Sequence, residues 1–373
     1  MGRSATRLRI FPRAVSKRLS HGRRSAPQAV RRVLVAHRLL LGDTLMLSPL
    51  LARLRAAWPN ALIDLVVNPA FACLYASRPW GVRAIGWDPA DPQTLAPLLA
   101  GDGYDLALVP GDNRYSWLAQ AAGARWIVAH EGDTPAWKNL PVDELRPFPT
   151  SAAAWGDMVA DLIDGPPPPA YCQTQWPAPV AAPIDLPSGD CAVLHVGAST
   201  PLKQWLPARW HALAERLEAQ GLQPVFLAGR GEAAIVREID PAARWRNLAG
   251  TLDLAQVWHL LAAARLLVAP DTGISHLGRI VGVPTITLFG PGSAIICGAG
   301  EFWRESPFWP VTVAPFPCRD QRMLFRRSLP WVERCGRSSQ ECPHPRCMDA
   351  IGLDHLDATV ARALAVPWPR AVA

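Results

Sequence analysis

The sequence predicts an α/β protein made of two Rossmann-like lobes that face a central cleft. Its 373 residues exceed what a single hydrophobic core usually supports, so two domains are expected. In both halves of the chain, short apolar runs alternate with helical segments, which is typical of parallel sheets covered by helices on both faces. Between the halves, eight of the 25 residues from 165 to 189 are proline, and neither a helix nor a central strand accommodates that density.

The first lobe is expected over residues 31–164, the linker over 165–189 and the second lobe over 190–373. In the first lobe, residues 44–57 place apolar side chains on one helical face, and apolar runs predict strands at 33–36, 63–67 and 106–109. The second lobe repeats this alternation, with strands predicted at 192–196, 224–228 and 266–269 and helices at 207–220 and 254–264.

Residues 1–30 are expected to form a basic tail. Ten of the 38 Lys and Arg residues lie within residues 1–32, which contain no acid, and the rest of the chain has fewer basic residues than its 31 acidic ones. Such a tail fits attraction to an anionic membrane surface, and it fits equally a solvated, disordered leader. No apolar run approaches the roughly 18 residues that span a bilayer, so we expect a cytoplasmic protein.

The segment after the predicted strand at 266–269 has the character of an anion site. Asp271-Thr272-Gly273 turns the chain into a helix, and His276 lies one helical turn beyond Gly273. Glycine lets a ligand approach the backbone, and the amides at a helix N-terminus favour an anion such as a diphosphate. An ordinary helix cap by Asp271 or Thr272 is the alternative interpretation.

Two further segments also follow predicted strands of the second lobe. Ser199, Thr200 and Lys203 combine hydroxyls with a compact positive charge, which suits phosphate oxygens. Glu232 follows the next strand, where a carboxylate could accept ribose hydroxyls or lie on the surface without such a role. In the first lobe, Asp43 follows the first strand and could act as a base or cap the next helix.

Together these segments resemble glycosyltransferase family 9, the ADP-heptose:lipopolysaccharide heptosyltransferases, over residues 31–365. The resemblance rests on the motifs Trp58-Pro59-Asn60-Ala61, Lys203-Gln204-Trp205, Asn247-Leu248-Ala249-Gly250 and Gly282-Val283-Pro284-Thr285, with Gly42-Asp43 and the run from Asp271 to His276.

The resemblance implies a GT-B fold, an ADP-activated heptose as donor, inversion at the anomeric carbon, and no cofactor or metal required for catalysis. By matched motif, Asp43 would be the general base and Glu232 would meet the adenosine ribose. The diphosphate would be held by Ser199, Thr200, Lys203, Thr272 and Gly273, and the sugar and phosphate end would be lined by Asp271 and His276.

Four cysteines near the C-terminus raise the question of a structural metal. Cys335, Cys342 and Cys347 lie close together in the sequence, with Cys318 and His344 nearby. Three or four thiolates could hold zinc or iron, although no Cys-x-x-Cys pair is present. A packing role as a structural clamp is the alternative.

The sequence therefore predicts a transferase that moves a heptose from a nucleotide sugar to a lipopolysaccharide-core or other lipid-linked glycan at the inner face of the inner membrane. Half of the residues are hydrophobic and 18% are charged, as in a folded enzyme. The alternatives are a GT-B transferase that uses another nucleotide sugar, and a nucleotide-sugar-binding protein without catalysis. No nucleic-acid partner is expected, because no helix-turn-helix, zinc-finger or RNA-binding signature is present.

Overall fold

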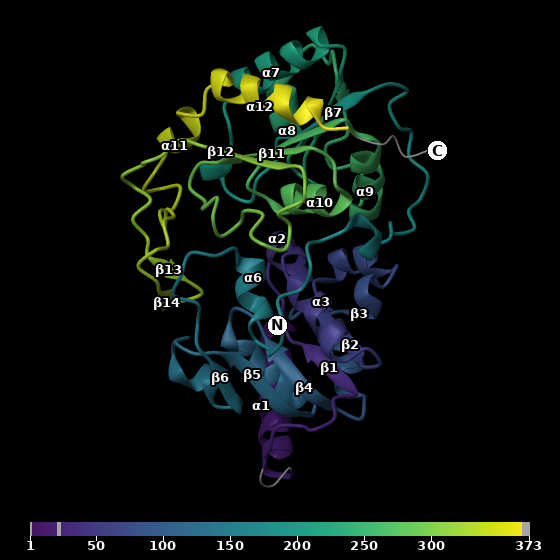
Figure 1. The fold of residues 1–373 in the computed structure, drawn as a ribbon, viewed down its shortest axis with the longest axis vertical. Helices are drawn as coiled ribbons and strands as arrows, with labels where there is room; N and C mark the ends of the chain where they lie inside the picture. Colours follow the sequence, from purple (N-terminus) through teal and green to yellow (C-terminus); the bar gives the residue numbers. More distant parts are fainter. Residues whose placement is uncertain (1, 21–23, 368–373) are drawn as a thin grey trace. The chain divides into compact units, whose positions relative to one another are not determined.

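The computed structural model describes residues 2–20 and 24–367, which form two compact units (Figure 1). Unit 1 comprises the chain up to Pro169 together with Thr174–Pro179 and Met323–Trp331. Unit 2 comprises Ala170–Gln173, Val180–Arg322 and the chain from Val332 onward. Residues 323–331 thus pack within the first unit, whereas the sequence places them in the second lobe. Residues 1 and 21–23 of the predicted tail, and 368–373 of the predicted second lobe, lie outside the described residues.

Unit 1 is built on a sheet of six strands in the order β3-β2-β1-β4-β5-β6, and every neighbouring pair is parallel. The strands are β1 (Arg32–Val35), β2 (Leu62–Val67), β3 (Val82–Gly86), β4 (Tyr104–Val109), β5 (Ala124–His130) and β6 (Glu144–Arg146). The order of connection reverses between β1 and β4, so the loops that follow these two neighbouring strands begin side by side at one edge and lead to opposite halves of the sheet. Ligands of doubly wound folds bind at such a switch point.

Short helices connect these strands. They are α1 (Gly2–Ser20), α2 (Leu41–Leu45), α3 (Ser48–Ala57), α4 (Ala96–Leu99), α5 (Ser116–Ala121) and α6 (Trp155–Ala160), with 3₁₀ turns η1 (Pro69–Tyr75), η2 (Pro79–Gly81), η3 (Pro92–Leu95), η4 (Asn113–Tyr115) and η5 (Ala136–Asn139). The helix predicted over 44–57 is divided into α2 and α3. Pro49 lies in the first turn of α3, and its ring is incompatible with a helix that continues unbroken from Leu45.

Helix α1 replaces the expected basic tail over residues 2–20. Its inward side buries Thr6, Ile10 and Ala14, and the helix packs against α5. Arg13 donates hydrogen bonds to the carbonyl oxygens of Ala121 and Leu99, at 3.0 and 2.6 Å. Arg18 pairs with Asp143 at 2.8 Å. The alternative of a disordered leader is therefore wrong for residues 2–20, because their arginines attach the helix to unit 1.

Unit 2 repeats the same architecture with the order β12-β11-β10-β7-β8-β9, again parallel throughout. Its strands are β7 (Cys191–His195), β8 (Gln223–Leu227), β9 (Arg246–Asn247), β10 (Leu266–Pro270), β11 (Thr285–Phe289) and β12 (Phe308–Thr312). Its helices are α7 (Pro207–Ala219), α8 (Ala233–Ile239), α9 (Leu254–Ala263), α10 (Gly273–Val281), α11 (Arg346–Asp349) and α12 (Leu353–Ala365), with the 3₁₀ turn η7 (Pro201–Lys203); the 3₁₀ turn η6 (Gln173–Gln175) lies where the chain passes between the units.

The two faces of the unit 2 sheet are covered by different helices. Helices α7, α8 and α12 cover one face, and α9 and α10 cover the other (Figure 1). Trp210 on α7, Leu356 on α12 and Phe226 of β8 are all fully buried in one core cluster of this unit. The switch point of this sheet lies between β7 and β10, by the same reasoning as for β1 and β4.

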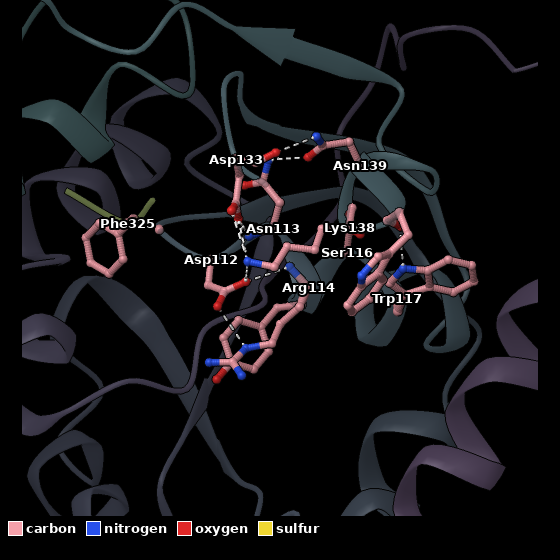
Figure 2. Close-up of polar contacts among 12 residues, drawn as sticks. Asp112, Asn113, Arg114, Ser116, Trp117, Asp133, Lys138, Asn139 and Phe325 are labelled. Atoms are coloured by element: carbon pink, nitrogen blue, oxygen red, sulfur yellow. Dashed lines mark hydrogen bonds and ion pairs between the residues drawn. The ribbon is translucent and has the colours of Figure 1, made fainter. Parts of the chain in front are cut away.

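A buried polar network holds the loops after β4 and β5 together in unit 1 (Figure 2). Lys138, only 5% exposed, forms ion pairs with Asp112 at 3.0 Å and Asp133 at 2.9 Å. Asn113 donates from its side chain to the carbonyl oxygen of His130 and to Oδ1 of Asn139, each at 2.7 Å. Every buried charge in this group therefore has a partner, as burial requires.

A hairpin from the second half of the chain completes this network. Its strands β13 (Met323–Leu324) and β14 (Arg327–Ser328) are antiparallel, and the two residues between them, Phe325 and Arg326, both have positive φ, at 46° and 64°. Buried Arg327 donates to the carbonyl oxygens of Gly111 at 2.8 Å, His130 at 3.0 Å and Glu131 at 2.6 Å. Burial lowers the pKa of Arg327 to about 10. These bonds explain why residues 323–331 fold with unit 1.

We predict that Arg327→Ala lowers the free energy of unfolding by about 3 kcal/mol or more, because it empties a buried position and leaves the carbonyl oxygens of Gly111 and Glu131 without their donor. Urea unfolding followed by circular dichroism measures the change. Arg326→Ala, at the exposed neighbouring position, should alter stability by less than about 0.5 kcal/mol. Equal stability of the Arg327→Ala protein and the wild type would contradict the anchoring role.

Candidate active site

The switch point of unit 2 brings together two segments that are 68 residues apart. Strands β7 and β10 are neighbours, so the turns at their carboxyl ends meet. Nζ of Lys203 donates to the carbonyl oxygen of Asp271 at 2.7 Å and to its Oδ2 at 2.8 Å. The Asp271 side chain is 7% exposed and that of Lys203 is 25% exposed. The structure therefore joins two of the predicted donor-binding motifs by one ion pair.

Helix α10 begins next to this ion pair, and the hydroxyl of its N-cap residue has no hydrogen-bond partner among the described residues. Thr272 is the N-cap residue and Gly273 the first residue of the helix. The Thr272 hydroxyl makes no capping hydrogen bond, and its Oγ1 is buried without a partner among the described residues. A buried polar atom without a partner is costly. The hydroxyl and the amides of the first helical turn form a group of donors suited to an anion.

The charges next to this helix end also favour an anion. Asp271, His276 and Cys297 place one ligand atom each within 4.8 Å of one another, an arrangement that could in principle hold a metal ion. However, Lys203 already pairs with Asp271, and Arg279 contacts Nδ1 of His276. The positive charges of Lys203 and Arg279 beside this group repel a metal ion.

His276 is neutral in this environment. Burial, reinforced by the positive charges of Arg279 and Lys203, holds the pKa of His276 well below its ordinary value of 6.5. A neutral imidazole can bind a ligand by a hydrogen bond without adding charge. The guanidinium of Arg279 lies 4.9 Å from the ring centre of Trp303 and donates to the carbonyl of Gly298, so its position is strongly constrained.

Glu232 holds two loops of unit 2 in place. Its two carboxylate oxygens accept hydrogen bonds from the backbone amides of Ala198 at 3.0 Å and Gly229 at 2.7 Å. A Cβ at Gly197 would overlap this carboxylate. Glu232 therefore links the loop after β7 to the loop after β8, and its contact with a ribose stays a prediction.

The remaining residues of the predicted diphosphate site lie in the loop after β7. Thr200 accepts a hydrogen bond from the amide of Leu202 at 3.4 Å and caps η7, while Ser199 is exposed. The turn that positions Lys203 begins at Thr200. Both side chains thus lie on the loop that carries Lys203, and their contacts with a ligand stay predictions.

Asp43 lies in unit 1, at the carboxyl end of β1. It is in the first turn of α2, and its Oδ2 accepts a hydrogen bond from the amide of Leu40 at 3.3 Å. The side chain is half-buried. Nearby, Nε2 of buried His37 lies 3.3 Å from Oγ1 of Thr44, and burial lowers the pKa of His37 to about 3. The capping interpretation of Asp43 is thus correct, and it does not exclude a base role.

Two residues of this region are absent from the predicted site. Arg279 follows His276 by one helical turn and lies on the same face of α10, so helical spacing could have indicated it. Cys297 joins Asp271 and His276 from the segment after β11, and no local signal marks it. Contacts of this second kind arise from the packing of distant segments.

Comparison with known proteins places these observations in a family. The model of glycosyltransferase family 9 (heptosyltransferase) matches residues 99–300. Lipopolysaccharide heptosyltransferase 1 of Pseudomonas aeruginosa is 30% identical over 326 residues, which cover 79% of this chain and 90% of that protein.

Two solved structures show the likeness of fold. The structure of Escherichia coli ADP-heptose lipopolysaccharide heptosyltransferase II has a TM-score of 0.67 at 18% identity, covering 90% of this chain and 98% of that chain. An E. coli heptosyltransferase solved with ADP has a TM-score of 0.60 at 21% identity, covering 75% of this chain and 92% of that chain. The predicted α/β, GT-B fold class is confirmed.

The four C-terminal cysteines line one small cavity in unit 2. Cys318, Cys335, Cys342 and Cys347 border a space of about 140 Å³ together with His344. Burial and the neighbouring sulfurs of Cys318 and Cys335 raise the pKa of Cys347 to about 11. Over residues 2–20 and 24–367, only the Asp271 group has three potential ligand atoms within 4.8 Å of one another, so no three of these cysteine sulfurs lie that close together. The structural metal stays a prediction.

If these cysteines hold a metal, purified protein should carry about one equivalent of zinc or iron, and Cys335→Ser should remove it and lower Tm. Elemental analysis and thermal unfolding measure both effects. Cys172→Ser, at an exposed cysteine outside the cavity, is the matched control. Metal-free protein whose Tm is unaffected by chelation would leave only the packing role.

Proposed function

The chain belongs to glycosyltransferase family 9, and we propose that it transfers a heptose from ADP-heptose to a lipopolysaccharide-core or related glycan acceptor, with inversion at the anomeric carbon. The observation that carries this proposal is the anion site of unit 2. Lys203, the unused hydroxyl of Thr272 and the first amides of α10 provide one positive charge and several donors at a switch point. The phosphate oxygens of a nucleoside diphosphate match these donors in hydrogen-bonding capacity.

In this reaction, the acceptor hydroxyl forms a bond to the anomeric carbon while the bond from that carbon to the ADP oxygen breaks. The hydroxyl proton moves to the carboxylate of Asp43, acting as general base. Negative charge grows on the departing diphosphate, and Lys203 with the amides of α10 stabilises it. Because Lys203 and these amides are part of the protein, we propose that the chemistry needs no metal or other cofactor.

We predict that Lys203→Ala and Thr272→Val each weaken ADP binding by about tenfold or more, because each removes a phosphate partner. Isothermal titration calorimetry in the presence of EDTA measures the affinity. Arg216→Gln, at the C-terminal end of α7, removes a charge far along the helix from the switch point and should leave ADP affinity unchanged. Unchanged ADP affinity in both site variants would refute the assignment.

The same titration separates the competing donors. ADP-sugars should bind more tightly than UDP- and GDP-sugars carrying the same sugar. A preference for another nucleotide would favour the alternative of a different nucleotide-sugar transferase. Tight ADP-heptose binding without transfer to any heptose-deficient lipopolysaccharide would favour a nucleotide-sugar-binding protein without catalysis.

We predict that Asp43→Asn lowers turnover by on the order of 10²-fold or more while ADP-heptose affinity changes little. Asn keeps the size of Asp and an oxygen that can accept the Leu40 amide, so α2 should persist. Single-turnover kinetics measures the chemical step directly. Asp102→Asn, at a fully exposed side chain of unit 1, is the control. If Asp43→Asn retains near-normal turnover, Asp43 is only a cap, and another group accepts the proton.

We also propose that the protein acts as a cytoplasmic enzyme in peripheral contact with an anionic membrane. Within residues 2–20 and 24–367, no helix is both long enough and apolar enough to cross a membrane. The outward side of α1, however, carries an apolar stripe of Leu8, Pro12, Val15 and Leu19, whose spacing places them on one helical face. Leu8 and Leu19 are 74% and 79% exposed.

The charge of α1 also favours contact of this helix with an anionic membrane. The helix contains no acidic residue, and within the part of the chain that the structure describes Arg9 and Arg13 donate to carbonyl oxygens, which leave their positive charge in place. An apolar stripe on a basic helix favours the interface of an anionic bilayer.

We predict that the double variant Leu8→Glu/Leu19→Glu binds anionic vesicles less tightly by about tenfold, since it removes buried apolar area and adds two negative charges. Co-sedimentation with phosphatidylglycerol-containing vesicles measures this. Val180→Glu/Leu186→Glu in unit 2 makes the same chemical change away from α1. Truncation of α1 is unsuitable, because it would expose the core around Ile10. Equal vesicle binding by both double variants would exclude a membrane role for α1.

A further inference from the structure

Helix α10 carries a buried arginine, Arg279, one turn beyond His276. Arg279 is 1% exposed and His276 is 5% exposed. The two side chains lie on one face of the helix, because residues three apart are neighbours on a helical surface. An arginine is rarely buried so completely unless its guanidinium is well bound, since removing that charge from water is costly. The contacts of Arg279 therefore indicate what it does beside His276.

Three neighbours from unit 2 hold the guanidinium of Arg279 in place. Its central carbon lies 4.9 Å from the ring centre of Trp303 and 4.6 Å from that of Phe308. Its Nη1 donates a hydrogen bond to the carbonyl oxygen of Gly298. Trp303 is itself only 2% exposed, so these contacts lie inside the unit. A planar guanidinium that contacts two aromatic rings and a carbonyl oxygen has little freedom to turn away from His276.

The other amino group of Arg279 determines where His276 carries its proton. Nη2 of Arg279 contacts Nδ1 of His276. A guanidinium has only donors, so Nδ1 must accept the hydrogen bond and has no proton of its own. A neutral imidazole has one N–H, which is then on Nε2. The Nδ1–H tautomer and the imidazolium would each place an N–H against another N–H, so the contact selects the Nε2–H tautomer.

The imidazole of His276 borders the anion site of unit 2. One ring nitrogen of His276, a carboxylate oxygen of Asp271 and Sγ of Cys297 lie within 4.8 Å of one another. Asp271 in turn pairs with Lys203 beside the start of α10. Arg279 occupies Nδ1, and Nε2 makes no hydrogen bond to any residue in the described parts of the chain. His276 therefore offers one N–H donor next to the group that we assign to the diphosphate.

We propose that Arg279 is a positioning residue that holds His276 as its Nε2–H tautomer, so that His276 donates a hydrogen bond to a phosphate oxygen of the nucleotide-sugar donor. The inference rests on the proposed transferase function, and Arg279 itself touches no substrate. An ionised phosphate oxygen only accepts hydrogen bonds, so the other tautomer would place the lone pair of Nε2 against it. The neutral ring adds a donor without adding charge, which leaves Lys203 as the cation that binds the diphosphate.

The first test detects the tautomer directly, by heteronuclear NMR of protein that contains isotope-labelled histidine. Protonated and unprotonated ring nitrogens differ strongly in chemical shift, and the signals lost in His276→Phe belong to His276. We expect only the Nε2–H tautomer in the wild type and in Arg279→Lys, whose ammonium also only donates, and a mixture of tautomers in Arg279→Met. Arg237→Met, at an exposed arginine of α8, should keep the wild-type tautomer. An Nδ1–H tautomer in the wild type, or an unchanged tautomer in Arg279→Met, would overturn the proposal.

The second test measures whether Arg279 acts through His276. Isothermal titration calorimetry gives the Kd for ADP of Arg279→Met, His276→Phe and the double variant. We expect each single variant to raise the Kd about tenfold, Arg279→Lys to restore most of the affinity lost in Arg279→Met, and the double variant to bind as His276→Phe does. A purely structural role of Arg279 would not depend on His276 in this way. Losses of affinity that add in the double variant would overturn the proposal.

The wild-type protein alone separates this proposal from the proposed function. Addition of ADP should shift the Nε2–H signal of His276, because its proton enters a hydrogen bond to phosphate. ADP binding that leaves this signal unchanged would overturn the proposal, even if Arg279→Met does not fold. A shifted signal without heptose transfer to a heptose-deficient lipopolysaccharide would instead contradict the proposed function and retain the role of Arg279 in nucleotide binding.

Discussion

The parallel order of the strands is the constraint on which the candidate sites of both units depend. In each sheet, the two central strands carry their connections in opposite directions, and the turns at their carboxyl ends meet at one edge. In unit 2, this geometry brings Lys203 to Asp271 and leaves the start of α10 open beside them. In unit 1, it brings Tyr115, after β4, to the carbonyl oxygen of Arg38, between β1 and Asp43. A change of strand order would disperse both groups.

Several side chains that the sequence marks as chemical also maintain the backbone. Glu232 accepts amides from two loops, Asp43 accepts the amide of Leu40, and Lys203 holds the carbonyl of Asp271. Loss of function in a variant at these positions can therefore arise from a displaced loop. Measurements that separate ligand affinity, the chemical step and folding stability distinguish the two causes.

In helix α1, the charged and the apolar side chains have different roles. Arg13 and Arg18 attach the helix to unit 1 by bonds to carbonyl oxygens and to Asp143. The apolar residues instead occupy both sides: Ile10 and Ala14 pack inward, while Leu8 and Leu19 face solvent. The basic composition that suggests a disordered tail thus belongs to a docked helix, and the proposed membrane contact rests on its outward apolar stripe.

The sequence by itself determined the central strands, the start of α10 and the family. Its apolar runs located the central strands within one or two residues, and Asp271-Thr272-Gly273 marked the start of α10. Both signals are local, because the burial of a strand and the capping of a helix depend on neighbouring residues. Only the tertiary structure decided that Arg327 anchors a distant hairpin in unit 1 and that Arg279 and Cys297 join His276. These features depend on contacts between segments far apart in the chain, and their energies come from burial and charge pairing that no local pattern contains.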